Sequence, residues 1–444
     1  MPYAAEGPTW SSRLEYLGQK SASDKKIVFN NLGHYINVET LTLYFNKLDG
    51  MRAVGIDGVT KEMYGKELQS NLAELVSRIR KCQYRPKPSR IVEIPKDDGS
   101  TRPLAISCLE DKIVQTAIAD ILSRIYEPLF YSCSYGFRAK KSAHDALKAV
   151  NKISYQVKNG AVVEVDLKSY FNTIPHEPLM AWLGQKISDK RFLFLIEVML
   201  KAPTMWERKC QENTAGAPQG SILSPVVANI YLHHVVDEWF AAITQSHFGG
   251  RAHEIRYADD LVFYFENTSH AEKFYRVLPK RLEKYGLKLH LEKSQMLKSG
   301  PWAAERAKRN HEKMGAFKFL GFTCYWGLSK NRNFWRLKFK SRSDRMRKTL
   351  KRIKVYLLQN LATNALRANQ RDIVDGFIRM VRGWLNYHAI SDNNDRVNAF
   401  LFQSKQLLLR WFNRRGSKKM NWDKLNAMLE RNKYPMTYKV TPMW

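Results

Sequence analysis

Two adjacent carboxylates interrupt an apolar stretch at residues 255–265, which reads Ile-Arg-Tyr-Ala-Asp-Asp-Leu-Val-Phe-Tyr-Phe. Neighbouring side chains on a strand point to opposite faces, so a continuous strand would bury Asp259 or Asp260 unpaired, at a cost of several kcal/mol. A hairpin with the pair at its tip avoids this cost and places both carboxylates at a wet edge. Two carboxylates this close repel each other unless a cation lies between them, and their oxygens suit Mg²⁺ in phosphoryl transfer. The alternative is a plain solvated turn.

Other residues that could take part in a reaction lie at the ends of predicted elements. Asp166 ends a buried-strand pattern over residues 161–166, and Tyr170 and Phe171 follow shortly after it. The loop 215–225, which contains Gln219, is rich in small residues and would let the backbone approach a ligand closely. These elements and the Asp pair together are typical of a nucleotidyl-transfer site.

A predicted hairpin lies upstream of these residues. Its strands cover residues 91–94 and 102–106 around an Asp-Gly turn, and the basic residues Lys96 and Arg102 flank that turn. Further along the chain, Ser107 with Glu110 and Ser269 with Glu272 predict capping boxes. The first opens a helix that runs to Pro128, and the second opens one that stops at Gly286. We also expect a helix over 226–240 and strands over 287–291 and 317–322.

The charge of the chain predicts a polyanionic partner. The 444 residues contain 73 Lys and Arg against 42 Asp and Glu, a net charge of +31. Residues 331–444 alone hold 26 Lys and Arg against 7 Asp and Glu, a net charge of +19. Nucleic acid is the first candidate and an anionic membrane surface the alternative, but no apolar run of about 18 residues is present. The five scattered cysteines suggest neither a disulfide framework nor a zinc module.

These motifs, in this order, give the chain a resemblance to a known family. It resembles the reverse transcriptases encoded by bacterial group II introns. The resemblance is carried by the Tyr-Ala-Asp-Asp box at 257–260, the loop 217–225, Gly-Phe-Arg at 136–138, and the segments 383–387 and 410–413. It implies an α+β, right-hand polymerase fold. An N-terminal helical extension and the start of the fingers would occupy 1–90, fingers and palm with an antiparallel sheet 91–330, and a helical, basic thumb and maturase domain 331–444.

The resemblance also implies roles for individual residues. Asp166, Asp259 and Asp260 would be the catalytic carboxylates, and with the Leu167 carbonyl they would bind two Mg²⁺ ions about 3.5–4 Å apart, which Mn²⁺ can replace. Nucleotide-binding residues would be Lys96, Arg102, Phe171, which blocks a 2′-hydroxyl, and Gln219. Template or intron RNA would contact Arg138, Arg414, Arg415, Lys418 and Lys419. The aromatic residues Trp384, Tyr387, Trp411, Trp422 and Trp444 fit base stacking and core packing equally well.

The expected activity is RNA-directed DNA synthesis, with maturase activity that assists intron splicing and retrohoming. Expected partners are an RNA template, structured intron RNA, a DNA primer, target DNA and deoxynucleoside triphosphates, without a membrane, in the bacterial cytoplasm. Two alternatives stay open: a domesticated reverse transcriptase, for example in antiviral defence, and an RNA-binding maturase without polymerase activity. Many members of the family that the chain resembles carry a further C-terminal domain with Cys pairs and His ligands. Because no cysteine follows Cys324, we expect no DNA endonuclease activity.

Overall fold

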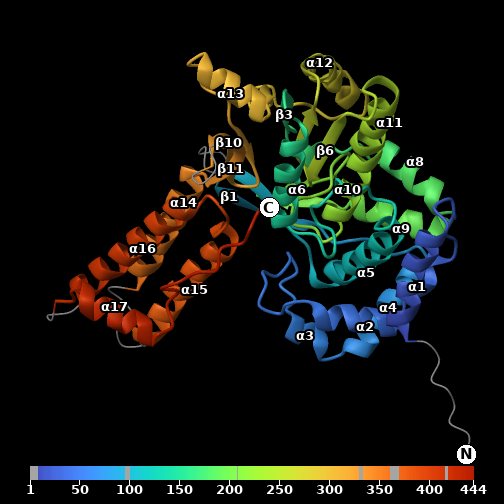
Figure 1. The fold of residues 1–444 in the computed structure, drawn as a ribbon. Helices are drawn as coiled ribbons and strands as arrows, with labels where there is room; N and C mark the ends of the chain where they lie inside the picture. Colours follow the sequence, from blue (N-terminus) through green and yellow to red (C-terminus); the bar gives the residue numbers. More distant parts are fainter. Residues whose placement is uncertain (1–8, 96–100, 208, 330–333, 361–369, 416–418) are drawn as a thin grey trace, which may run out of the picture. The chain divides into compact units, whose positions relative to one another are not determined.

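The computed structural model describes residues 9–95, 101–207, 209–329, 334–360, 370–415 and 419–444 (Figure 1). The chain divides into two compact units. Unit 1 comprises Met1–Ala143, Val165–Phe263 and Glu272–Ser294, and unit 2 comprises His144–Glu164, Tyr264–Ala271 and Gln295–Trp444. Four of the described elements pass from one unit into the other along the chain: α6 (Ala143–Gln156), β3 (Gly160–Asp166), β7 (Asp260–Phe265) and α12 (Thr268–Lys284). Helices and sheets are mixed, as predicted, and no helix among the described residues is long and apolar enough to cross a membrane.

Unit 1 is built mainly from helices, with a small sheet and the start of a hairpin. Its helices are α1 (Trp10–Ser23), η1 (Leu32–Tyr35), α2 (Val38–Lys47), α3 (Lys61–Gly65), α4 (Leu68–Arg80), α5 (Leu109–Tyr126), α7 (Tyr170–Thr173), α8 (His176–Lys186), α9 (Lys190–Leu200), α10 (Ser224–Leu232), η2 (His233–Asp237) and α11 (Glu238–His247). Its strands are β1 (Ser89–Pro95), β2 (Thr101–Ile106), β4 (Thr204–Trp206), β5 (Lys209–Gln211) and β6 (Ala252–Tyr257). The predicted helix that runs to Pro128 is α5, and its apolar residues between Ile113 and Ile125 are buried.

The sheet of unit 1 has the strand order β2-β1-β4-β5. Strands β1 and β2 pair antiparallel, with Ile91 opposite Ala105 and Ile94 opposite Arg102. This pairing confirms the predicted hairpin, although its turn, with Lys96, lies outside the described residues. Strand β2 also contacts the loop that contains Gln219, because the Ala105 N–H donates to the Gln219 carbonyl at 2.6 Å.

Unit 2 contains the C-terminal helices and a three-stranded antiparallel sheet of order β11-β10-β9. Its elements are most of α6 (Ala143–Gln156), β8 (Gln295–Ser299), α13 (Pro301–Arg309), β9 (Phe317–Phe319), β10 (Phe322–Leu328), β11 (Trp335–Ser341), α14 (Ser343–Gln359), α15 (Gln370–His388), α16 (Asn394–Arg415) and α17 (Trp422–Arg431). Helices α14, α15 and α16 lie alongside one another (Figure 1) and share a core that includes Ile353, Phe377, Phe400 and Leu408. The basic last quarter is therefore a folded helical assembly around an apolar core.

Both predicted capping boxes are wrong in detail. At the start of α5, the Ser107 hydroxyl contacts Ser89 and Gln115 at 3.2 and 3.1 Å, and Glu110 pairs with Arg78 at 2.9 Å. At the start of α12, Asn267 takes the capping role, since its Oδ1 accepts the Ser269 N–H at 2.9 Å. Tertiary partners outweighed the local motif in the first case, and a competing cap two residues upstream did so in the second.

The strand predicted over 287–291 is also wrong. Only Leu289 forms a bridge, antiparallel to Leu167. The predicted segment 317–322 divides into β9 and the start of β10, because Leu320 and Gly321 turn the chain with positive φ values of 47° and 79°.

Candidate active site

The Asp pair lies where β6 turns into β7, in the predicted hairpin. The turn residue with a left-handed backbone is Ala258, at φ 56°, and not an aspartate. Asp259 follows it and is partly buried, whereas Asp260 is the first residue of β7 and is exposed. The two carboxylates therefore differ in environment, although the sequence predicted that both would lie at a wet edge.

Asp166 is the last residue of β3, as predicted, and its backbone is anchored on both sides. Its N–H donates to the Ser294 hydroxyl at 3.0 Å, and its carbonyl accepts the His290 N–H at 2.8 Å. The next residue, Leu167, is buried and bridges Leu289. The 288–294 segment thus fixes the end of β3 although it forms no continuous strand.

Asp166 and Asp259 lie close enough to interact electrostatically. Burial raises the pKa of the Asp259 carboxyl, and the negative charge of Asp166 raises it further. A hydrogen bond from its own backbone N–H and the positive charge of Arg102 act in the opposite direction. The environment of Asp259 therefore contains one competing acid and one basic residue, both of which the sequence singled out.

This pair of carboxylates suits a hard divalent cation. A cation between them would remove the mutual repulsion that raises the pKa of Asp259, and their oxygens are the ligands Mg²⁺ prefers. As placed, the described residues contain no cluster of three or more His, Cys, Asp or Glu side chains of the kind that encloses a metal ion. Asp166 and Asp259 are carboxylates that interact with each other, and they are the donor type that the predicted cation needs.

The small-residue loop 215–220 links α7 to β2 through backbone contacts. The Ala217 N–H donates to the Phe171 carbonyl at 2.7 Å, and the Gln219 carbonyl accepts the Ala105 N–H at 2.6 Å. Its two glycines are required. A Cβ on Gly216 would lie 2.8 Å from the Asn172 oxygen, and one on Gly220 would lie 2.4 Å from the Ala105 oxygen.

The loop thereby links Phe171 and Gln219, and β2, which carries Arg102, contacts the same loop through Ala105. Phe171 is partly buried on α7, with its ring 5.4 Å from that of Tyr170 and 6.5 Å from that of Phe137. The side-chain carbonyl oxygen of Gln219 is buried and accepts no hydrogen bond from the described residues. Arg102 is exposed on β2. The loop and the elements that contact it offer a ring, an unused acceptor and a cation.

Arg138 is placed differently from the other predicted site residues. Its guanidinium is almost fully buried and pairs with Glu127 at 2.9 Å. It also donates to the carbonyls of Tyr131 and Ser134 at 2.7 and 2.8 Å. These bonds commit Arg138 to its own loop, so we leave it out of the proposed RNA-binding surface below.

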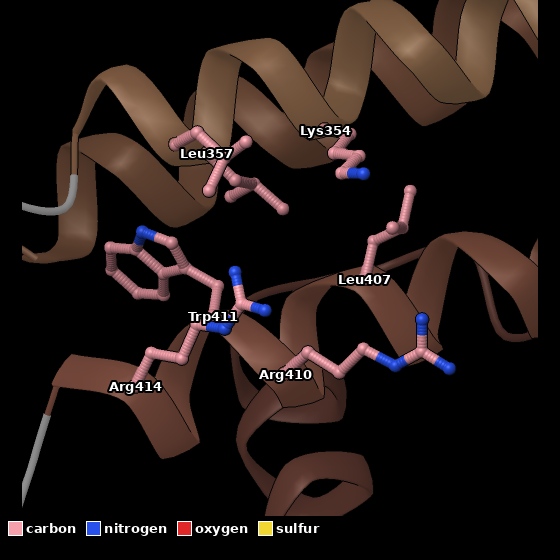
Figure 2. Close-up of a pocket in the computed structure, with 7 residues that line it drawn as sticks. Lys354, Leu357, Leu407, Arg410, Trp411 and Arg414 are labelled. Carbon is pink, nitrogen blue, oxygen red and sulfur yellow. The ribbon is translucent and has the colours of Figure 1, made fainter.

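In unit 2, Arg414 lies on a basic pocket between α14 and α16 (Figure 2). Its floor is apolar, its volume is about 120 Å³, and Lys354 and Arg410 lie on it with Arg414. The apolar lining residues are Leu357, Leu358, Leu407 and Trp411. None of the residues described as lining it is acidic. We call Lys354, Arg410 and Arg414 the basic trio.

The remaining predicted RNA-binding residues follow α16. Lys419 is exposed, whereas Lys418 and the side chain of Arg415 lie outside the described residues. Among the aromatic residues, Trp384 and Trp411 are buried in the helical core, whereas Trp422 and Trp444 are 37% and 68% exposed. Core packing thus accounts for the first two and leaves the last two at the surface.

The sequence analysis missed the residue that supports the Asp259 turn. Arg256 is fully buried and forms an ion pair with the fully buried Asp237 at 2.6 Å. A signal was present, because an arginine within an apolar strand pattern needs a buried partner. Nothing in the sequence showed that this partner would be Asp237 on a helix.

Comparison with known proteins agrees with these observations. Residues 94–324 match the family model described as reverse transcriptase (RNA-dependent DNA polymerase). The chain is 34% identical over 237 residues to an uncharacterized 91 kDa protein in the cob intron of Schizosaccharomyces pombe, 35% over 212 residues to protein YkfC of Escherichia coli, and 34% over 231 residues to the group II intron-encoded protein LtrA of Lactococcus lactis.

These matches cover 50%, 47% and 50% of this chain, and 28%, 54% and 37% of the three relatives. The chain therefore spans at most about half the length of these relatives. The family model covers more than half of the chain, from β1 into β10, and includes Asp166, Asp259 and Asp260. The resemblance to group II intron-encoded proteins is confirmed, and the chain belongs to the reverse transcriptase (RNA-dependent DNA polymerase) family.

Proposed function

We propose that this chain is an RNA-directed DNA polymerase of the group II intron type. The observation that carries the proposal is the proximity of Asp166 and Asp259, each at the end or turn of a strand, with the positive charge of Arg102 near them. Carboxylates are needed to hold divalent cations, and a cation is needed to hold a triphosphate. Membership of the reverse transcriptase family supports the same assignment.

In this proposal, Asp166, Asp259 and Asp260 hold the metal, with the Leu167 carbonyl as a further ligand. When bound, two Mg²⁺ ions supply positive charge that lowers the pKa of the primer 3′-hydroxyl and stabilises the leaving pyrophosphate. The repulsion between Asp166 and Asp259 supports their assignment as a shared site. Asp260 is exposed at the start of β7 and would complete the ligand set from the solvent side.

Around these carboxylates, the nucleotide would be bound by residues of three elements. Arg102, together with Lys96, would neutralise the triphosphate. The unused Gln219 acceptor would bind a donor of the sugar or base. The Phe171 ring would occupy the space that a 2′-hydroxyl needs, which selects deoxynucleotides. In the same proposal, residues 91–330 form fingers and palm and residues 331–444 form the thumb and maturase domain.

The experiment is extension of a DNA primer on an RNA template by purified protein with Mg²⁺ and deoxynucleoside triphosphates. We expect extension by the wild type and a loss on the order of 10³-fold in Asp259→Asn, because a missing ligand costs several kcal/mol of transition-state stabilisation. Asp423→Asn, which removes an exposed carboxylate on α17, is the matched control and should extend normally. Wild-type extension by Asp259→Asn would contradict the site assignment.

We further propose that unit 2 binds structured RNA and assists splicing. The basic trio supports this proposal, because three cations around an apolar floor can hold phosphates beside an unpaired base. The net charge of +19 in residues 331–444 adds the long-range attraction that binding to a polyanion needs. This activity would depend on a binding surface and not on the metal-binding carboxylates.

The test is splicing, at near-physiological Mg²⁺, of precursor RNA transcribed from the genomic region that carries this chain. Asp259→Asn should splice normally, whereas Lys354→Gln, Arg410→Gln and Arg414→Gln combined should splice poorly. Extension without any effect on splicing would leave the polymerase and favour a domesticated reverse transcriptase. Splicing without extension would favour a maturase with no polymerase role.

A further inference from the structure

A fully buried arginine lies directly behind the turn that carries Asp259. Arg256 Nε and Nη2 donate to the two carboxylate oxygens of Asp237 at 2.7 and 2.6 Å, and Nη1 donates to Asn229 Oδ1 at 2.9 Å. Neither member of the ion pair is exposed. A bidentate pair of this kind fixes both the position and the plane of the guanidinium.

The same guanidinium reaches the turn itself. Arg256 Nη1 also approaches the Ala258 carbonyl at 3.4 Å, which is the peptide group directly before Asp259. Ala258 adopts φ 56°, a left-handed conformation that is unfavourable for a residue with a Cβ. An unfavourable turn persists only where its surroundings hold it in place.

A second wall, formed by Tyr135 and Gly136, also packs against the turn. The Asn229 side-chain amide donates to the Gly136 carbonyl at 2.7 Å, and the Tyr135 N–H donates to the Arg256 carbonyl at 2.8 Å. A Cβ on Gly136 would lie 2.3 Å from the Ala258 nitrogen, so this wall touches the turn backbone. Asn229 therefore joins the arginine to the segment that closes over Ala258.

The helical segment α10–η2 supplies two partners of Arg256, which are Asn229 and Asp237. Asn229 and Asp237 are eight residues apart, and in a regular α-helix they would differ by about 80° around the axis. The π-helical turn η2 (His233–Asp237) takes up one extra residue, which returns Asp237 close to the face of Asn229. The widened turn thus explains how one helix supplies both partners.

The two buried carboxyl groups of this network, Asp237 and Glu254, differ in their pKa values. Burial alone would raise the pKa of Asp237, but the Arg256 charge and hydrogen bonds from His233 and Arg256 lower it to about 2. Burial and the Asp237 charge raise the pKa of the neighbouring Glu254, which favours its protonated form. One ionised carboxylate therefore binds Arg256 through Nε and Nη2, which leaves Nη1 to donate to Asn229 and to approach the Ala258 carbonyl.

We propose that Arg256 and Asp237 are positioning residues that set where the Asp259 carboxylate points. This inference rests on the proposed polymerase function of Asp259. Buried ion pairs contribute little net stability compared with apolar residues of similar volume, so stability alone is a weak reason for this one. The contact of Arg256 with the Ala258 carbonyl indicates instead that the ion pair fixes the backbone directly before Asp259.

The experiment compares Arg256→Lys with Tyr84→Phe. Lysine keeps the buried charge but loses the bidentate geometry and the link to Ala258. Tyr84→Phe removes the contact between the buried Tyr84 hydroxyl and Asp111, which is another buried polar contact of unit 1. Three quantities are measured: the single-turnover rate of nucleotide addition, RNA affinity, and Mn²⁺ affinity by electron paramagnetic resonance on protein bound to an RNA–DNA duplex with an unreactive primer end.

We expect Arg256→Lys to lower the single-turnover rate by about 10²-fold, as a small misplacement of a reacting group does, and to weaken Mn²⁺ binding several-fold. RNA affinity should stay unchanged, and Tyr84→Phe should leave all three quantities near wild type. A rate and Mn²⁺ affinity for Arg256→Lys within twofold of those for Tyr84→Phe would overturn the proposal.

Asn229→Ala keeps the Arg256–Asp237 ion pair and removes the two hydrogen bonds that join Arg256 to the Gly136 carbonyl through Asn229. It decides the question if Arg256→Lys does not fold. It should reduce the rate and Mn²⁺ affinity in the same direction but less strongly, and wild-type values would overturn the proposal. If the wild type extends no primer, the polymerase function fails. The Mn²⁺ affinity then tests the positioning proposal without the activity measurement. Weaker Mn²⁺ binding in Arg256→Lys would support the positioning proposal, and unchanged Mn²⁺ binding would overturn it.

Discussion

Arg256 in unit 1 and Arg414 in unit 2 are both arginines, but one is buried in the protein and the other is exposed to solvent. Arg256 is fully buried, and its guanidinium donates hydrogen bonds to Asp237 and Asn229. Arg414 is exposed beside two other cations and an apolar floor, and no acidic residue is described on that pocket. The difference teaches that net charge alone says little about what a basic residue does. A paired, buried arginine fixes the geometry of its neighbours, whereas an exposed surface arginine attracts a polyanion.

The comparison also separates two kinds of failure. Loss of a buried group around Asp259 should reduce the rate of chemistry and leave RNA affinity intact. Loss of exposed cations in unit 2 should reduce affinity and leave the rate at saturating RNA intact.

The largest expected effect is that of Asp166→Asn. The amide cannot supply the charged ligand that a divalent cation needs, so extension should fall on the order of 10³-fold. RNA affinity, measured by filter binding, should remain within about twofold of wild type, because phosphate contacts dominate binding. A comparable loss of affinity would break the separation between the two regions.

A smaller effect is expected from replacing the basic trio with Gln. RNA affinity should fall on the order of tenfold to 100-fold, and the slope of log affinity against log salt should become shallower by about 2, since three phosphate contacts are lost. The matched control replaces Lys273, Arg276 and Lys280, three exposed cations of α12. An equal loss in that control would mean that net charge, and not the pocket, determines binding.

The smallest effect is expected from Phe171→Ala. Removing the ring should reduce discrimination against ribonucleotides by about tenfold while extension with deoxynucleotides continues, because a steric block rejects a substrate without taking part in the chemistry. Competition between the two nucleotide types measures this ratio. An unchanged ratio would show that the ring packs in the core and does not contact the sugar.

The placement of the candidate site's carboxylates on their elements could be predicted from the sequence because the signals are local. Asp166 ends a short buried strand, and an Asp pair within a strand pattern requires a turn. Neither inference needs knowledge of distant segments. The helix α5 could be predicted for the same reason, since its apolar periodicity continues over four turns.

The parts that could not be predicted depend on which partner each polar group meets once the chain is folded. Ser107 fits a capping box, but Ser89 and Gln115 bind its hydroxyl instead. The segment around Leu289 reads as a strand, but its single bridge to Leu167 serves only to fix the end of β3. Likewise, Arg138 reads as a surface cation, and only the fold brings Glu127 and two carbonyls to it. Local patterns cannot reveal which of several competing partners a polar group will meet.

The Arg256–Asp237 pair also constrains how the chain is made. The two residues are 19 positions apart, so at 5–20 residues per second a ribosome adds Arg256 about one to four seconds after Asp237. During that interval the helix that carries Asp237 has no cation from β6 with which to bury its carboxylate, and an unpaired buried charge is strongly disfavoured. This face of the nascent helix must therefore stay in water until β6 arrives, so burial of Asp237 and completion of the Asp259 turn should occur together.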